Sequence, residues 1–160
     1  MTSQYDRMSD TFDNYDRKLL RALQSDASLS MDDLAAHVGL SRNATWRRMR
    51  LLEEAGVIRG RVALLDAAAL GCDLSVFIAV RTDRHDAEWA RAFAKAVENI
   101  PEITGAYRTS GDLDYLIRAR VNSVAAYDLL YKKLIAQIPL SDVSASFVME
   151  ELKETTALPL

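Results

Sequence analysis

Two short helical segments with only three residues between them constrain the fold of this chain more than any other feature of its sequence. The first is predicted to begin after Ser30, with Asp33 as its capping-box partner, and to end at Gly39 in a left-handed turn. The second is predicted to begin after Ser41 and to run to Ala55. A turn this tight between two helices is typical of a helix-turn-helix.

An earlier helix completes the predicted N-terminal domain. Its pattern opens at Asp13, with Asp16 three residues on as a capping partner, and apolar residues follow at helical spacing up to Leu23. We therefore expect a helix-turn-helix domain over residues 12–56. The polar, mixed-charge residues 1–11 are expected to form a disordered lead-in.

The last of these helices has two faces when its residues are placed at about 100° intervals. Thr45, Met49 and Leu52 fall together and are predicted to face the core, with Arg48 at the core edge, where its head reaches a neighbour. Trp46 falls on the opposite side among arginines, and Asn and Arg suit bidentate contacts to adenine and guanine edges. The residues expected to contact DNA, including two from the following segment, are Ser41, Arg42, Asn43, Trp46, Arg47, Arg50, Arg59 and Arg61.

The charge distribution supports this expectation, although the net charge of the chain is −3. Residues 1–65 carry ten Lys and Arg against nine Asp and Glu, whereas residues 66–160 carry ten against fourteen. Residues 41–61 alone hold six arginines and two acids. A focused basic patch favours double-stranded DNA as a partner. The alternative is a solvated basic face with Trp46 packed on another subunit.

Residues 57–65 are β-prone and predict a linking strand, within a linker over residues 57–72. Arg59 and Arg61 would alternate onto one face of this strand, toward backbone phosphate. The first domain is therefore expected to be winged-helix-like.

The second domain, residues 73–160, shows a different pattern. Its predicted elements are a strand over 74–82, a helix over 86–98, strands over 103–109 and 113–121, a helix after Ser123 and a strand over 143–151. The order β-α-β-β-α-β is that of a ferredoxin-like fold, so the chain as a whole is α+β. Two helices cover one face of such a sheet. The other face is expected to be apolar and covered by a second subunit.

Other function classes find little support in the sequence. The single cysteine, Cys72, allows no internal disulfide and no thiolate cluster for zinc. No stretch approaches the roughly 18 to 20 apolar residues of a membrane span. We therefore expect a cytoplasmic protein with no membrane partner, no metal and no cofactor.

The first alternative interpretation is that the chain is an enzyme. Asp112 and Asp114 form an acidic pair, and His85 is a candidate base. Acidic residues at a hairpin tip serve turn geometry in any case. No nucleophile–base pair, metal spacing or phosphate loop supports catalysis, so the sequence predicts that the chain is not an enzyme.

Five stretches, in order, resemble the Lrp/AsnC (feast/famine) family of transcriptional regulators. They are Asp16-Arg17-Lys18-Leu19-Leu20; Leu34-Ala35 through Val38-Gly39-Leu40-Ser41; Arg47 through Ile58; Ser110-Gly111-Asp112-Leu113-Asp114-Tyr115; and Thr155-Thr156-Ala157-Leu158-Pro159. The resemblance extends from about Phe12 to the end of the sequence. The family often has prolines near the start of the recognition helix, where this chain has Arg42 and Ala44, so no base preference is carried over.

The resemblance implies a sequence-specific regulator of amino-acid metabolism, associated with the nucleoid, whose DNA binding responds to a small amino acid. It also implies homodimers that assemble through their sheets, and further into octamers. The pocket residues that it implies are Ser110, Gly111, Asp112, Asp114 and Tyr115, with Ser144 or Ser146 reaching in from a neighbouring chain. The stretches His85-x-x-Glu88-Trp89, Leu140-Ser141-Asp142-Val143 and Ser146-Phe147 resemble a cysteine-responsive subgroup, so cysteine is the first candidate effector. The alternative is an architectural DNA-binding protein that ignores effectors.

Overall fold

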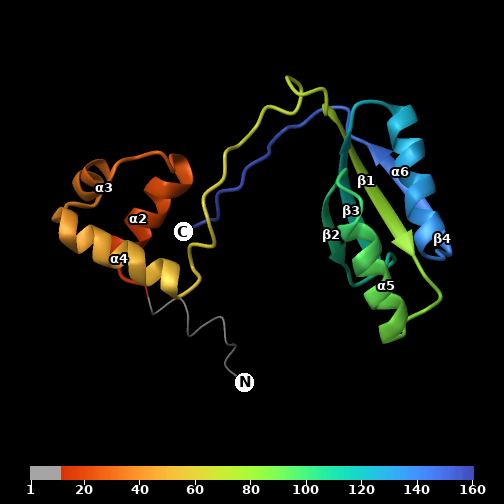
Figure 1. Ribbon diagram of the computed structural model, residues 1–160, viewed down its shortest axis with the longest axis horizontal. Helices are drawn as coiled ribbons and strands as arrows, with labels where there is room; N and C mark the ends of the chain where they lie inside the picture. Colours follow the sequence, from red (N-terminus) through yellow and green to blue (C-terminus); the bar gives the residue numbers. More distant parts are fainter. Residues whose placement is uncertain (1–11) are drawn as a thin grey trace. The chain divides into compact units, whose positions relative to one another are not determined.

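The computed structural model describes residues 12–160, so the expected lead-in over residues 1–11 lies outside the described residues. The chain forms two compact units, whose helices and strands are labelled in Figure 1. One unit consists of Met1–Ala63 together with Lys153–Leu160, and the other of Leu64–Leu152. No helix within residues 12–160 has both the length and the apolar character needed to cross a membrane.

Local capping sets the limits of the helices in the first unit, as the sequence predicts. These helices are α2 (Asn14–Ser25), α3 (Met31–Val38) and α4 (Arg42–Glu54). Asp13 and Asp16 form a capping box at the start of α2, and Ser30 begins a second one at α3. Gly39 ends α3 with a φ of 72°, a conformation that glycine adopts without steric cost. Ser41 then caps α4 by accepting a hydrogen bond from the N–H of Ala44, which completes the tight turn.

The core of the first unit lies where the three helices meet. α2 contributes Leu19, which is fully buried, and α3 contributes Leu34 and Val38. Thr45, Met49 and Leu52 of α4 are all buried, which confirms the predicted inner face of that helix. The opposite face of α4 is therefore left toward solvent.

The linking strand predicted over residues 57–65 does not form. Residues 59–66 have no regular secondary structure. The N–H groups of Val57 and Ile58 instead bond the carbonyl of Leu52 and close the end of α4. A strand needs a neighbour for its backbone hydrogen bonds, and no other described strand pairs with this segment. Arg59 and Arg61 are consequently not fixed on one face of a strand.

The second unit has the predicted β-α-β-β-α-β order. Its elements are β1 (Leu74–Arg81), α5 (Ala87–Glu98), β2 (Ile103–Arg108), β3 (Tyr115–Val121), α6 (Val124–Gln137) and β4 (Asp142–Phe147). The strands form one antiparallel sheet in the order β2-β3-β1-β4, which is the ferredoxin-like arrangement. The last strand ends at Phe147, where its ladder with β1 reaches Val76, and so it is shorter than the strand predicted over 143–151.

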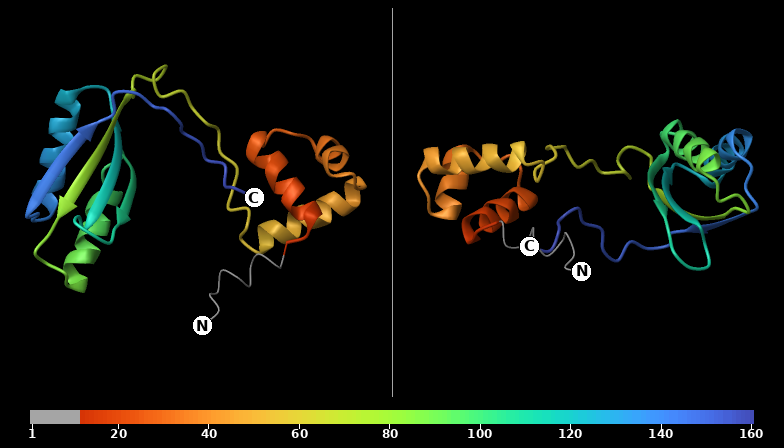
Figure 2. Two further views of the ribbon diagram at one scale, coloured as in Figure 1. Left: turned by 180° about the vertical axis from the view of Figure 1, so that it is seen from behind. Right: turned by 90° about the horizontal axis from the view of Figure 1, so that it is seen from below.

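The two faces of this sheet differ. α5 and α6 lie against one face (Figure 2), where Val76, Ile78 and Val80 of β1 are buried. The other face, called the open face below, presents Phe77 and Ala79 from β1 and, by register, Leu116 and Arg118 from β3 and Ser144 and Ser146 from β4. The expectation of an apolar open face holds for its centre, where Phe77, Ala79 and Leu116 lie. Polar side chains lie beside this centre, Arg118 on β3 and the two serines on β4.

Candidate nucleic-acid interface and ligand site

The outward face of α4 carries exposed residues of the types that bind DNA. The Trp46 side chain is 53% exposed, and Asn43, Arg47 and Arg50 beside it are exposed as well. The Arg50 guanidinium lies over the Trp46 ring, 5.8 Å from the ring centre. Ser41 and Arg42 lie at the N-terminus of the helix, where unpaired backbone N–H groups favour phosphate. The structure therefore places the candidate residues of α4 on one solvent-facing surface.

The arginines of this surface differ in their partners. Arg42 pairs with Asp32 at 3.3 Å, Arg50 with Glu54 at 2.6 Å, and Arg61 with Glu53 at 2.9 Å. All six of these side chains are about half exposed or more, and exposed ion pairs contribute little to stability. Phosphate can therefore replace the carboxylates at low cost. Arg47 and Arg59 have no ion-pair partner among residues 12–160.

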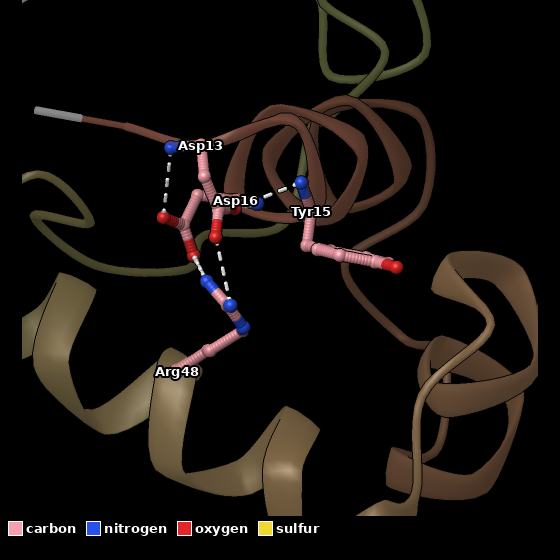
Figure 3. Close-up of polar contacts among 4 residues, drawn as sticks. All are labelled: Asp13, Tyr15, Asp16 and Arg48. Atoms are coloured by element: carbon pink, nitrogen blue, oxygen red, sulfur yellow. Dashed lines mark hydrogen bonds and ion pairs between the residues drawn. The ribbon is translucent and has the colours of Figure 1, made fainter. Parts of the chain in front are cut away.

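Arg48 has a different role from its neighbours. Its Nη2 lies 2.7 Å from Asp13 Oδ2, and its Nη1 lies 2.8 Å from Asp16 Oδ1 (Figure 3). Its guanidinium also lies 5.4 Å from the centre of the Tyr15 ring. The expectation that the head of Arg48 reaches a neighbour is confirmed. The contact joins the start of α2 to the middle of α4 and so fixes the direction of α4.

The same contacts shift the pKa of Asp13. The N–H of Asp16, which donates to the Asp13 carboxylate, and the Arg48 guanidinium hold this pKa below its ordinary value of 3.8. A carboxyl group whose pKa is lowered by folding stabilises the fold above its ordinary pKa and loses that contribution as the pH falls through the lowered value. The ion pair between Asp13 and Arg48, which links α2 to α4, is therefore intact at neutral pH.

The hairpin between β2 and β3 is the candidate ligand site. Gly111 has a φ of 118°, in the region that favours glycine, and Ser110, Gly111 and Asp112 are exposed at the tip. The carbonyl of Asp112 accepts a hydrogen bond of 2.7 Å from Arg81 Nε, at the end of β1. Arg81 also lies 3.5 Å from Asp142. The hairpin tip is therefore held beside the end of β1 and the start of β4.

Asp114 has a structural partner within the unit. Its Oδ2 accepts a 2.9 Å hydrogen bond from the N–H of Thr82, which caps the end of β1. Its Oδ1 lies 3.9 Å from Nδ1 of His85. The side chain is 31% exposed, so part of the carboxylate is open to solvent. Asp114 thus contacts the loop after β1 through both oxygens, Oδ2 at Thr82 and Oδ1 near His85.

The remaining predicted pocket residues point in opposite directions. Tyr115 packs on the helix side of the sheet, with its ring 4.4 Å from that of Phe93. Ser144 and Ser146 lie on the open face, where a second chain is expected. Within one chain the Tyr115 ring therefore packs on the helix side of the sheet, and the two serines lie on its other face. Sequence reasoning missed Arg81, because its place beside the hairpin depends on strand register.

No group of three or more His, Cys, Asp or Glu side chains is positioned to hold a metal ion within residues 12–160.

The two units together define a regulator that joins a helix-turn-helix to an α/β ligand-binding domain. Residues 12–59 match the winged helix-turn-helix DNA-binding family, and residues 75–158 match the Lrp/AsnC ligand binding domain.

Whole-chain comparisons agree with these two matches. The chain is 48% identical over 148 residues to the glutamate uptake regulatory protein of Zymomonas mobilis, covering 92% of this chain and 90% of that protein. An AsnC family transcriptional regulator from Agrobacterium tumefaciens has 49% identity and a TM-score of 0.90, covering 92% of this chain and 97% of that one. A transcriptional regulator from Neisseria meningitidis, solved as a complex with L-Met, has 32% identity and a TM-score of 0.87, covering 92% and 96%.

This protein belongs to the Lrp/AsnC family. It is a DNA-binding transcriptional regulator with an effector-binding domain, and the family consists of regulators rather than enzymes. The predicted fold class, family and function class are confirmed.

Proposed function

We propose that this protein controls genes of amino-acid metabolism by placing the exposed face of α4 in the major groove and by binding a free amino acid at the β2–β3 hairpin. The observation that carries the proposal is the surface of α4, where Trp46 and Arg47 stand exposed above a buried opposite face. One relative is named for glutamate uptake, and one neighbour was solved with L-Met, which supports an amino-acid effector. DNA binding would place the protein in the cytoplasm, on the nucleoid.

The hairpin offers partners for both charges of an amino acid. Arg81 and the exposed backbone at Gly111 suit a carboxylate, while the exposed Asp112 side chain and Oδ1 of Asp114 suit an ammonium group. A zwitterion needs both partners, since a charge that is buried without one is costly. Cysteine remains our first candidate effector, and glutamate and methionine follow from the two comparisons.

Removing the charge of Asp114 is expected to weaken amino-acid binding. Asp114→Asn keeps an oxygen that can accept from the N–H of Thr82, so the loop after β1 should stay in place. We expect about a tenfold or greater rise in the Kd, the loss typical of one charge-assisted hydrogen bond. Calorimetry with cysteine, glutamate and methionine measures this change.

The matched control is Asp128→Asn, which removes an exposed carboxylate paired with Lys132 on α6. Equal affinity of the parent and the Asp114→Asn variant for the same amino acid would place the pocket elsewhere. If no amino acid binds the parent while DNA still does, the protein is an architectural DNA-binding protein.

We further propose that homodimers form through the open face and assemble further into octamers. The centre of this face holds Phe77, whose side chain is 38% exposed in the single chain. Ser144 and Ser146 lie on the same face and would border the neighbouring chain. A two-fold dimer also presents two recognition helices to two half-sites.

Phe77→Asp should therefore dissociate the dimer, because it places a charge at the centre of a buried contact. Sedimentation equilibrium at micromolar concentration should show monomers of the variant and at least dimers of the parent. Leu129→Asp on α6, at a side chain that is 60% exposed, is the control for adding a charge to an apolar surface. A parent that sediments as a monomer would overturn the proposed assembly.

A further inference from the structure

We propose that residues 153–160, called the tail below, act as a strap that docks on α2 and restricts the movement of the helix-turn-helix unit, so that the protein binds paired half-sites more tightly. This inference rests on the proposed DNA-binding function. The tail follows the second unit in the sequence, yet Lys153–Leu160 pack as part of the first. Neither family match assigns a role to this docking.

The tail is held on α2 by reciprocal hydrogen bonds. Gln24 accepts from the N–H of Leu158 at 2.6 Å and donates from Nε2 to the Leu158 carbonyl at 3.2 Å. One turn earlier, Arg21 Nε donates to the main-chain oxygen of Leu160 at 2.8 Å, and Nη2 donates to the same oxygen. Both side chains therefore bind backbone, so the contact fixes the path of the tail rather than a particular side chain of it.

The start of the tail is also anchored. Glu151, two residues before it, pairs with Arg120 of β3 at 2.6 Å within the second unit. Leu158 lies seven residues after Glu151, and an extended chain over those seven steps spans about 25 Å at most. A short segment held at both ends is a tether that adds to the covalent linker before β1.

The helix that receives the tail also holds the recognition helix. Asp13, the N-cap of α2, and Asp16 in its first turn both form ion pairs with Arg48 of α4. A restraint applied to α2 is therefore a restraint on α4. Restricting a binding module before it binds lowers the entropy cost of placing two modules on one DNA duplex. Undocking should then weaken binding to two half-sites and leave binding to one half-site unchanged.

The test uses the full chain with Arg21→Ala and Gln24→Ala combined. Hydrogen exchange at the Leu158 amide reads docking directly, and we expect it to be about fivefold faster or more in the double variant. The second measurement compares affinity for a duplex that the parent selects from a random pool with affinity for the same duplex scrambled in one half. We expect the ratio of the two affinities to fall about tenfold in the double variant.

Lys18→Ala is the matched control, since it removes an exposed positive charge from the same helix without touching the tail. It should leave both the exchange rate and the affinity ratio as in the parent. Unchanged exchange at Leu158 in the double variant would refute docking. Faster exchange with an unchanged affinity ratio would refute the role in paired binding. A parent that selects no duplex would overturn the proposed function and this role with it, and exchange would still decide docking.

Discussion

The double variant Arg47→Ala/Arg50→Ala is expected to bind its DNA site at least about 30-fold more weakly than the parent. Each bidentate contact to a base contributes about 1–3 kcal/mol, and the two side chains lie on the exposed face of α4. Arg47 has no competing ion pair within residues 12–160, and the pairing of Arg50 with Glu54 is exposed. The fold should be unaffected, because neither side chain belongs to the core. Fluorescence anisotropy with a selected duplex measures the change.

The control for lost charge is Arg91→Ala/Lys95→Ala, which removes two exposed positive charges from α5 in the other unit. It should reduce affinity only slightly, through long-range electrostatics that salt screens. If the α4 variant and the parent bind the duplex equally well, α4 is not the recognition helix.

Met49→Ala, on the buried face of the same helix, should lower the stability of the fold. Met49 is 3% exposed and lies among Leu19, Leu34 and Leu52 in the core of the first unit. Truncating a buried side chain of this size lowers the free energy of unfolding by about 2–5 kcal/mol. Urea denaturation followed by circular dichroism measures the loss, and Arg47→Ala is the matched surface control with little expected change. A Met49→Ala variant as stable as the parent would contradict the assignment of the two faces.

The helices of the first unit could be predicted closely because their limits are encoded locally. A capping box needs only two residues three apart, and Gly39 ends α3 through its own backbone freedom. The two faces of α4 follow from periodicity alone. The β-α-β-β-α-β order could be predicted equally well, since it depends on whether each segment is a helix or a strand and not on how the strands pair.

The linking strand and the details of the ligand site could not be predicted in this way. Val62, Leu64 and Leu65 have the composition of a strand and remain exposed, since a strand exists only where another strand supplies its hydrogen bonds. Arg81 meets Asp112, 31 residues further on, only because the antiparallel register brings the end of β1 to the hairpin. The Thr82–Asp114 hydrogen bond depends on the same register. Contacts of this kind leave no local signal in the sequence.

The engagement of Arg48 by two aspartates has a consequence for the thermodynamics of DNA binding. Of the six arginines in residues 41–61, five remain to neutralise phosphates and release condensed counterions. Three of those five are paired with Asp32, Glu54 or Glu53 in the free protein, so each must give up a carboxylate partner before it contacts a phosphate. With about 0.9 counterions released per phosphate contact, these arginines give a logarithmic salt dependence no steeper than about −4.5 per protomer. The affinity of this regulator should therefore vary less with intracellular ionic strength than the number of arginines in its recognition region suggests.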